Sequence, residues 1–249
     1  MIAARRRLTR ARMLAFLEEL ASKRAPGGRT AYFPPSSGDP GPDAPPELAS
    51  LIAESGTGAV MYLDPAGGFL VVPPFPVKVP GSCGGWETGL LGDMLRREHT
   101  LALALVRLGS FAVGVARGEE LVASKVGTGL VHARHRQGGS SATRFRRHRE
   151  KQIEYFLTRV CEHAREKLEP YERAIDYIIY GGAWTTILTL QKQCPYLKRF
   201  EGRSLPPLLD IPDPRLPVLE NAVTRAWSSE IITWRPDEAP VDAENYRRG

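Results

Sequence analysis

The residues best suited to chemistry stand in one short segment. It sets a glutamine, two glycines and small hydroxyl side chains between arginines, and it reads Arg134-His135-Arg136-Gln137-Gly138-Gly139-Ser140-Ser141-Ala142-Thr143-Arg144. Two adjacent glycines let the backbone take positive φ angles and approach a ligand closely, and the amide N–H groups of such a turn can bind an anion. Ser140, Ser141 or Thr143 can cap a following helix, whose amino-terminal dipole favours a phosphate or a developing oxyanion. On composition alone, a basic loop that binds polyanions without doing chemistry is an equal alternative.

Positive charge is concentrated around this segment. The chain has 249 residues and a formal net charge of +6. Between Leu130 and Lys151 seven basic side chains accompany a single acid, Glu150, and the rest of the chain is neutral overall. One intensely basic stretch in a balanced protein is typical of a surface that binds a polyanion, so nucleic acid is the leading class of partner.

The composition excludes several other classes of protein. The 42% hydrophobic and 25% charged residues are typical of a globular chain, and no apolar run is long enough to span a membrane. Glu18 and Glu19 follow the Arg-rich amino terminus where a signal peptide needs an apolar core. Cys83, Cys161 and Cys194 are odd in number and far apart, which favours a reducing compartment over a disulfide framework. We therefore expect a cytoplasmic protein without membrane contact, and we expect it to be a monomer.

Residues 1–97 predict a small amino-terminal region. The spacing of apolar residues predicts a helix over 4–24. The following segment, 25–46, holds seven prolines and four glycines and predicts an extended linker. Apolar runs at 59–63 and 69–72 flank a turn sequence and predict a β-hairpin.

Residues 98–236 predict an α+β domain, and a polar tail follows at 237–249. Short apolar runs separated by glycine-containing turns predict an antiparallel meander of strands at 101–107, 110–116 and 120–126. A long amphipathic helix follows over 144–168. The remaining pattern predicts a strand at 175–180, a helix at 183–193, a proline-rich crossover, a helix at 216–228 and a strand at 230–234. The expected fold is a mixed β-sheet flanked by helices, with RNase H-like topology.

The stretch from Val126 to Glu150 resembles the signature loop and following helix of the Vms-like release factors (VLRF family). These proteins are relatives of the catalytic middle domain of eukaryotic and archaeal peptide-chain release factors and of Pelota. The resemblance includes the strands at 101–126, the loop, the long helix and the 177–184 region, which together make up over half of the chain. It implies a release-factor middle domain at 98–236, and a ribosome-associated peptidyl-tRNA hydrolase that frees stalled nascent chains without reading a codon.

The same resemblance implies the site residues and the partners. In the release-factor superfamily the glutamine of a Gly-Gly-Gln loop promotes hydrolysis of the ester that joins peptide to tRNA. The matching residue is Gln137, with Gly138, Gly139 and Ser140 beside it. Glutamine stands first here, as in the Vms-like branch, so this branch matches in sequence motif whereas ordinary release factors match only in the role of the glutamine. Glutamine can orient a water, and a backbone N–H in the glycine turn can stabilise the oxyanion. The partners would be peptidyl-tRNA and the rRNA of the large ribosomal subunit, whose phosphates would contact Arg134, Arg136, Arg144, Arg146, Arg147 and Arg149.

Two other functions stay open at this point. One is a non-catalytic factor that binds RNA or the ribosome, in which Gln137 merely packs; the other is an endonuclease that cleaves the tRNA acceptor end. No cofactor and no metal are expected, because Cys161 and His163 point to different faces of one helix and cannot easily share a metal with Cys194. A two-metal nuclease would need clustered carboxylates, and the strands offer only scattered ones such as Asp176. Three tryptophans are interpreted as structural: Trp184, Trp227 and Trp234.

Overall fold

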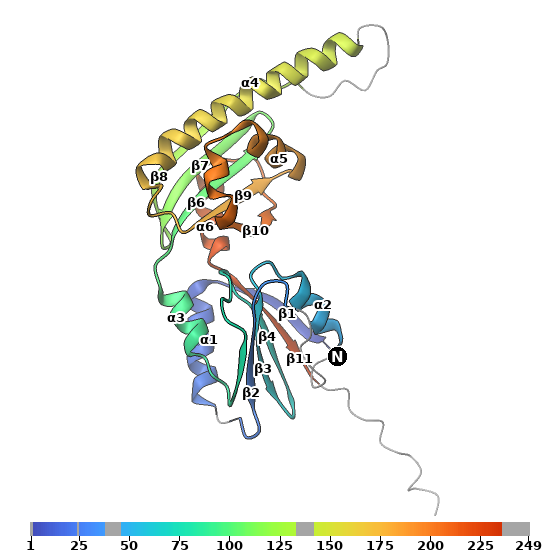
Figure 1. The fold of residues 1–249 in the computed structure, drawn as a ribbon, viewed down its shortest axis with the longest axis vertical. Helices are drawn as coiled ribbons and strands as arrows, with labels where there is room; N and C mark the ends of the chain where they lie inside the picture. The colour runs from blue at the N-terminus through green and yellow to red at the C-terminus, as the bar shows by residue number, and fades with distance from the viewer. Residues whose placement is uncertain (1, 24, 38–45, 133–141, 236–249) are drawn as a thin grey trace, which may run out of the picture. The chain divides into compact units, whose positions relative to one another are not determined.

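Each of two units in the chain is built around its own β-sheet (Figure 1). The computed structural model describes residues 2–23, 25–37, 46–132 and 142–235. The amino-terminal unit comprises residues 1–95 and 228–249, and the central unit comprises residues 96–227.

The amino-terminal unit contains a six-stranded antiparallel sheet with the strand order β1-β11-β4-β3-β2-β5. The strands are β1 (Ile2–Leu8), β2 (Arg29–Phe33), β3 (Ala59–Asp64), β4 (Gly67–Val72), β5 (Gly81–Gly84) and β11 (Ser229–Trp234). The predicted hairpin is confirmed as β3 and β4, since their register pairs Asp64 with Gly67 across a tight turn.

Helices cover both faces of this sheet. They are α1 (Arg10–Ser22), α2 (Pro46–Glu54) and α3 (Gly89–Arg96). Leu17 of α1 and Leu91 of α3 pack in one cluster with Tyr62 of β3, whereas Leu48 of α2 packs in another with Met61. Because successive side chains of a strand point to opposite faces, β3 is buried on both sides and forms the centre of the unit.

Three predictions for this part of the chain are wrong. The Arg-rich amino terminus forms strand β1 ahead of α1, and β2 lies inside the segment predicted as a linker. The last strand, β11, was predicted in the 98–236 domain, but it pairs with β1 and β4 in the amino-terminal unit. These pairings join distant parts of the chain, such as Arg5 with Ile232, and local composition carries no signal for them. The amino-terminal region is therefore a helix-covered sheet of six strands and not a helix with a hairpin.

The central unit contains a mixed five-stranded sheet with the order β10-β9-β6-β7-β8. Its strands are β6 (Thr100–Arg107), β7 (Ser110–Arg117), β8 (Glu120–Thr128), β9 (Tyr177–Gly182) and β10 (Ser204–Leu209). β6, β7 and β8 form the predicted antiparallel meander, while β9 runs parallel to β6 and β10 runs parallel to β9. β10 was missed within the proline-rich crossover; it tolerates Pro206 because it lies at the edge of the sheet, where a missing N–H donor costs little.

Helices also cover both faces of the central sheet. They are α4 (Ala142–Leu168), α5 (Trp184–Gln193) and α6 (Leu216–Ala226). Phe156 of α4 and Leu190 of α5 pack with Val113 on one face. α6 lies on the other face, where a Cβ at Gly114 would be only 3.0 Å from the Leu219 Cδ2. The predicted α+β class and the helix-flanked mixed sheet are confirmed.

Two of the three cysteines form a disulfide. Cys161 on α4 and Cys194 just after α5 are bonded, with their Cα atoms 5.5 Å apart. Cys194 is fully buried, and Cys83 is free. The three cysteines did not predict this bond, and that expectation is corrected: α4 and α5 cover the same face of the sheet, which a separation of 33 residues does not reveal.

Candidate nucleic-acid interface

Six of the ten predicted site residues lie outside the described residues. These are Arg134, Arg136, Gln137, Gly138, Gly139 and Ser140. The structure describes what flanks them, namely the chain up to His132 and helix α4 from Ala142 onward. The site is therefore built from these two flanking stretches.

The stretch that leads into this segment is attached to α4. β8 ends at Thr128, and the Gly129 N–H donates to the Gly109 carbonyl at 2.9 Å. The His132 N–H donates to Oε1 of Gln152 at 3.2 Å, and the His132 carbonyl accepts a hydrogen bond from Nε of Arg149 at 2.9 Å. Both backbone polar groups of His132 are thus bonded to α4, the same helix that begins at the other end of the segment.

The first turns of α4 present exposed arginines. Arg144, Arg146 and Arg147 are exposed, whereas Arg149 is half-buried because its side chain holds His132. Arg146 lies 3.8 Å from the carboxylate of Glu150, but such an exposed pair on a helix is worth only about 0.3–0.5 kcal/mol and does not prevent a phosphate contact. RNA contact by the three exposed arginines stays a prediction, and the structure adds a positioning role for Arg149.

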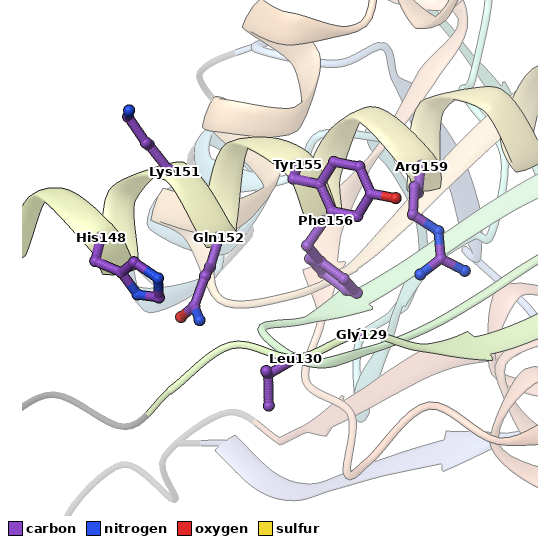
Figure 2. A pocket seen from close by; sticks show the side chains of 8 residues that line it. All are labelled: Gly129, Leu130, His148, Lys151, Gln152, Tyr155, Phe156 and Arg159. Atoms are coloured by element: carbon purple, nitrogen blue, oxygen red, sulfur yellow. The ribbon is translucent and has the colours of Figure 1, made fainter.

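A groove that was not predicted from the sequence lies beside the attached stretch (Figure 2). This groove, called the Tyr155 groove below, has a volume of about 460 Å³ and lies between Gly129–Leu130 and one face of α4. The α4 side chains that line it are His148, Lys151, Gln152, Tyr155, Phe156 and Arg159. The sequence did carry a signal for this groove: residues 148, 152, 155 and 159 are three or four positions apart, a spacing that places their side chains in one stripe on the predicted helix.

The tryptophans divide into two groups. Trp227 is buried and its indole N–H donates to the Gly118 carbonyl at 2.7 Å, while Trp234 is buried in the core of the amino-terminal unit. Their structural interpretation is confirmed. It is wrong for Trp184, which is 63% exposed, because the first turn of α5 buries Thr186 and Ile187 instead.

The perturbed tyrosines of the central unit are structural groups. Burial raises the pKa of Tyr180 to about 12 and that of Tyr196 to about 12, so both phenols are neutral at physiological pH.

Asp176, which the sequence offered as a scattered carboxylate of the strands, has a structural role. It accepts a hydrogen bond from the Thr100 N–H at 2.8 Å and lies 3.5 Å from Nδ1 of His99. This carboxylate thus links the start of β6 to the chain that enters β9.

The residues that the structure describes contain neither a metal-binding cluster nor a membrane-spanning helix. No three His, Cys, Asp or Glu side chains among these residues come together as a group that could hold a metal ion. None of the described helices has both the length and the apolar character needed to cross a membrane.

The central unit defines the class of protein. Its sheet leads into a Gln-Gly-Gly sequence that stands directly before a helix with an arginine-rich first half, the arrangement that the release-factor resemblance requires. The family model described as Actinobacteria/chloroflexi VLRF1 release factor (acVLRF1) matches residues 99–232, over half of the chain. The chain belongs to this family, and the predicted membership is confirmed.

Archaeal release factors are similar to part of the chain. Peptide chain release factor subunit 1 of Archaeoglobus fulgidus is 35% identical over 92 residues, which are 37% of this chain and 23% of the relative. The protein of the same name from Thermococcus onnurineus is 32% identical over 120 residues, 47% of this chain and 29% of the relative. The chain thus spans less than a third of the length of these curated relatives. A solved structure of the archaeal translation termination factor aRF1 is 19% identical, with a TM-score of 0.42 over 88% of this chain and 70% of that one.

Proposed function

We propose that the protein hydrolyses the ester that joins a nascent peptide to tRNA on the large ribosomal subunit. One observation carries the proposal: the Gln-Gly-Gly sequence stands between His132, which α4 holds through both backbone groups, and the first turns of α4, which present three exposed arginines. Phosphate contacts of these arginines would bring Gln137 to the acceptor end of a tRNA. Membership of a release-factor family supports the same role.

The chemistry assigned to the Gln137 segment needs no titrating group. A glutamine amide both donates and accepts hydrogen bonds, so Gln137 would orient a water or the terminal ribose hydroxyl toward the ester carbonyl. Backbone N–H groups at Gly138, Gly139 and Ser140 would stabilise the tetrahedral oxyanion, an effect worth about 10²–10³ in rate in protein enzymes. The ribosome would supply the remaining positioning.

The partners and the place of action follow from this role. The arginines of α4 would contact phosphates of rRNA or of the tRNA acceptor end, which makes binding depend strongly on salt and little on sequence. We propose that the protein acts as a monomer in the cytoplasm, where ribosomes carry stalled chains, and that it needs no codon. Release from isolated large subunits, which hold no messenger RNA, tests codon independence directly.

The decisive experiment is single-turnover release of a labelled nascent chain from isolated large subunits that carry peptidyl-tRNA. Wild type is compared with Gln137→Ala and with Gln193→Ala, a matched control because Gln193 is exposed at the end of α5. We expect Gln137→Ala to keep subunit affinity and to lose about 10²-fold in release rate, roughly the effect of misplacing one reacting group. Gln193→Ala should release the peptide at the wild-type rate.

The size of the tRNA product separates the alternatives. Peptide release with a full-length tRNA, lost in Gln137→Ala, supports the hydrolase. Release with a shortened tRNA shows that the protein is an acceptor-end endonuclease instead. Tight binding of wild type with no release at all shows a non-catalytic ribosome-binding factor.

A further inference from the structure

The Tyr155 groove has an apolar floor and an exposed aromatic wall. Phe156 is buried and lies under the groove, and Gly129 lets the backbone approach this ring, since a Cβ at Gly129 would lie only 2.6 Å from the Phe156 Cδ2. Tyr155 and Leu130 are 68% and 72% exposed. Figure 2 shows Leu130 on the stretch that faces α4, with Tyr155 and Arg159 on the helix beside it. The large side chains of Tyr155 and Leu130 are thus exposed to solvent at the same groove.

The two charged residues that line the groove, Lys151 and Arg159, are basic. His148 also lines the groove, and Lys151 points away from the Gly129–Leu130 stretch (Figure 2). At 100° per residue, positions 148, 152, 155 and 159 fall within an arc of about 60° on α4. The acids Glu150 and Glu154 lie well outside this arc on the same helix. The next acid on the stripe is Glu162, one turn beyond Arg159, and it marks the end of the basic part.

Of the exposed arginines of α4, Arg144 lies only about 20° outside this arc, whereas Arg146 and Arg147 lie on the part of the helix that also carries Glu150 and Glu154. From Arg144 to Arg159 the helix rises about 22 Å, which gives a basic surface several nucleotides long. An exposed ring beside cations on a rigid helix is the combination with which proteins hold single-stranded nucleic acid, because every base has a π-face and every linkage carries a phosphate. A membrane surface fits less well, since only Tyr155 and Leu130 offer exposed apolar area in the groove.

We propose that the Tyr155 groove binds one unstacked nucleotide of single-stranded RNA. The base stacks on the Tyr155 ring above Phe156, and Arg159 and Lys151 contact the neighbouring phosphates. His132, held by Gln152 of the same stripe, places this nucleotide next to the chain that leads into the Gln137 segment. The inference rests on the proposed function for its RNA partner, and two sources share the chemistry: the tRNA acceptor end and an rRNA strand.

Equilibrium binding tests the groove without any chemical step. Fluorescence anisotropy is measured with two labelled probes, a deacylated tRNA and the same tRNA without its single-stranded 3′ end, and sedimentation is measured with vacant large subunits. The variants are Tyr155→Ala, Tyr155→Phe and Arg159→Ala, with Arg173→Ala as a control because Arg173 is an exposed arginine of the same unit outside the groove. Tyr155 is exposed, so its replacement leaves the core intact, and thermal denaturation verifies this.

Stacking of one base predicts that Tyr155→Ala raises the Kd about 5- to 150-fold, while Tyr155→Phe, which keeps the ring, changes it less than about 2-fold. Arg159→Ala should weaken binding and reduce its salt dependence by about one phosphate contact, and Arg173→Ala should do neither. An effect seen with intact tRNA and lost with the shortened tRNA assigns the nucleotide to the acceptor end. An effect seen only with large subunits assigns it to rRNA.

Unchanged binding of Tyr155→Ala to both tRNA and large subunits overturns the inference, and so does an equal loss in Tyr155→Phe. These outcomes are distinct from failure of the proposed function. If wild type releases no peptide but Tyr155→Ala binds RNA weakly, the groove is an RNA site on a non-catalytic factor. If Gln137→Ala abolishes release and Tyr155→Ala binds as wild type, the hydrolase stands and the groove does not.

Discussion

Reduction of the Cys161–Cys194 disulfide should destabilise the central unit by a predictable amount. The bond closes a loop of 33 residues between α4 and α5, and cross-linking a loop of that length removes about 12.5 cal/mol/K of entropy from the unfolded chain. At 25 °C this corresponds to about 3.7 kcal/mol, near the upper end of the usual 2–4 kcal/mol. For a unit of this size, we expect the melting temperature to fall by roughly 10 °C.

The assay must resolve the central unit from the amino-terminal unit, since each has its own core. Urea unfolding with and without a reductant, followed by hydrogen exchange of amides in α4, α5 and the β6–β7 strands, reports the stability of the central unit alone. Cys83 lies in the other unit and is free, so Cys83→Ser should leave the difference between the two conditions unchanged. Reduction is the cleaner perturbation, because replacing the buried Cys194 would also alter packing.

Two results would refute the reasoning. One is a change on reduction below about 0.5 kcal/mol in the central unit, which would mean that the cross-link does not restrict the unfolded chain as the loop-entropy argument requires. The other is a purified protein in which both thiols react with an alkylating agent after unfolding without a reductant, which would show that the bond does not form.

Two further predictions concern the groove floor and the amino-terminal sheet. Gly129→Ala would place a Cβ 2.6 Å from the Phe156 ring and should lower the free energy of unfolding by about 1–3 kcal/mol, measured by thermal denaturation. Gly202→Ala is the control and should not destabilise the protein, because nothing lies within 4 Å of a Cβ at that position. Equal effects of the two substitutions would contradict the packing argument. The hydrogen bond from Arg5 lowers the pKa of Glu230. The pair therefore stabilises the sheet by about 0.5–1 kcal/mol at pH values above the ordinary carboxyl pKa. This contribution is lost as the pH falls through the lowered pKa of Glu230. Glu230→Gln should therefore destabilise the amino-terminal unit in urea at about pH 7, and this deficit should shrink as the pH falls below the ordinary carboxyl pKa; a deficit that stays constant into acid would contradict this sign.

Elements with local partners were predictable, and elements with distant partners were not. The meander β6–β8 has turns of two residues between its strands, and α4 packs through one face of periodic apolar residues. The local sequence pattern therefore predicts both. β1 and β2 lack that signal: β1 is rich in arginine, and β2 stands in a Pro/Gly-rich segment. Both are strands because β11 and β3 offer them a ladder of hydrogen bonds.

The candidate site divides in the same way. Residue types alone named the Gln137 segment and the arginines around it, and helical periodicity placed the arginines at the start of a long helix. Helical periodicity could not predict that Arg149 donates a hydrogen bond to the His132 carbonyl while Arg146 and Arg147 stay exposed. That distinction depends on where the chain after β8 meets the helix.

By itself, the sequence determined the concentration of positive charge, the Gln-Gly-Gly segment, the family and the α+β class. The tertiary structure decided which strands pair, that Cys161 and Cys194 bond, and that Tyr155 and Leu130 line one groove. The physical reason is that helix and strand periods state which side chains share a face, but not which part of the chain will cover that face. The covering partner is selected by packing across the whole unit, where close contacts such as that of Gly129 with Phe156 arise between residues that are distant in sequence.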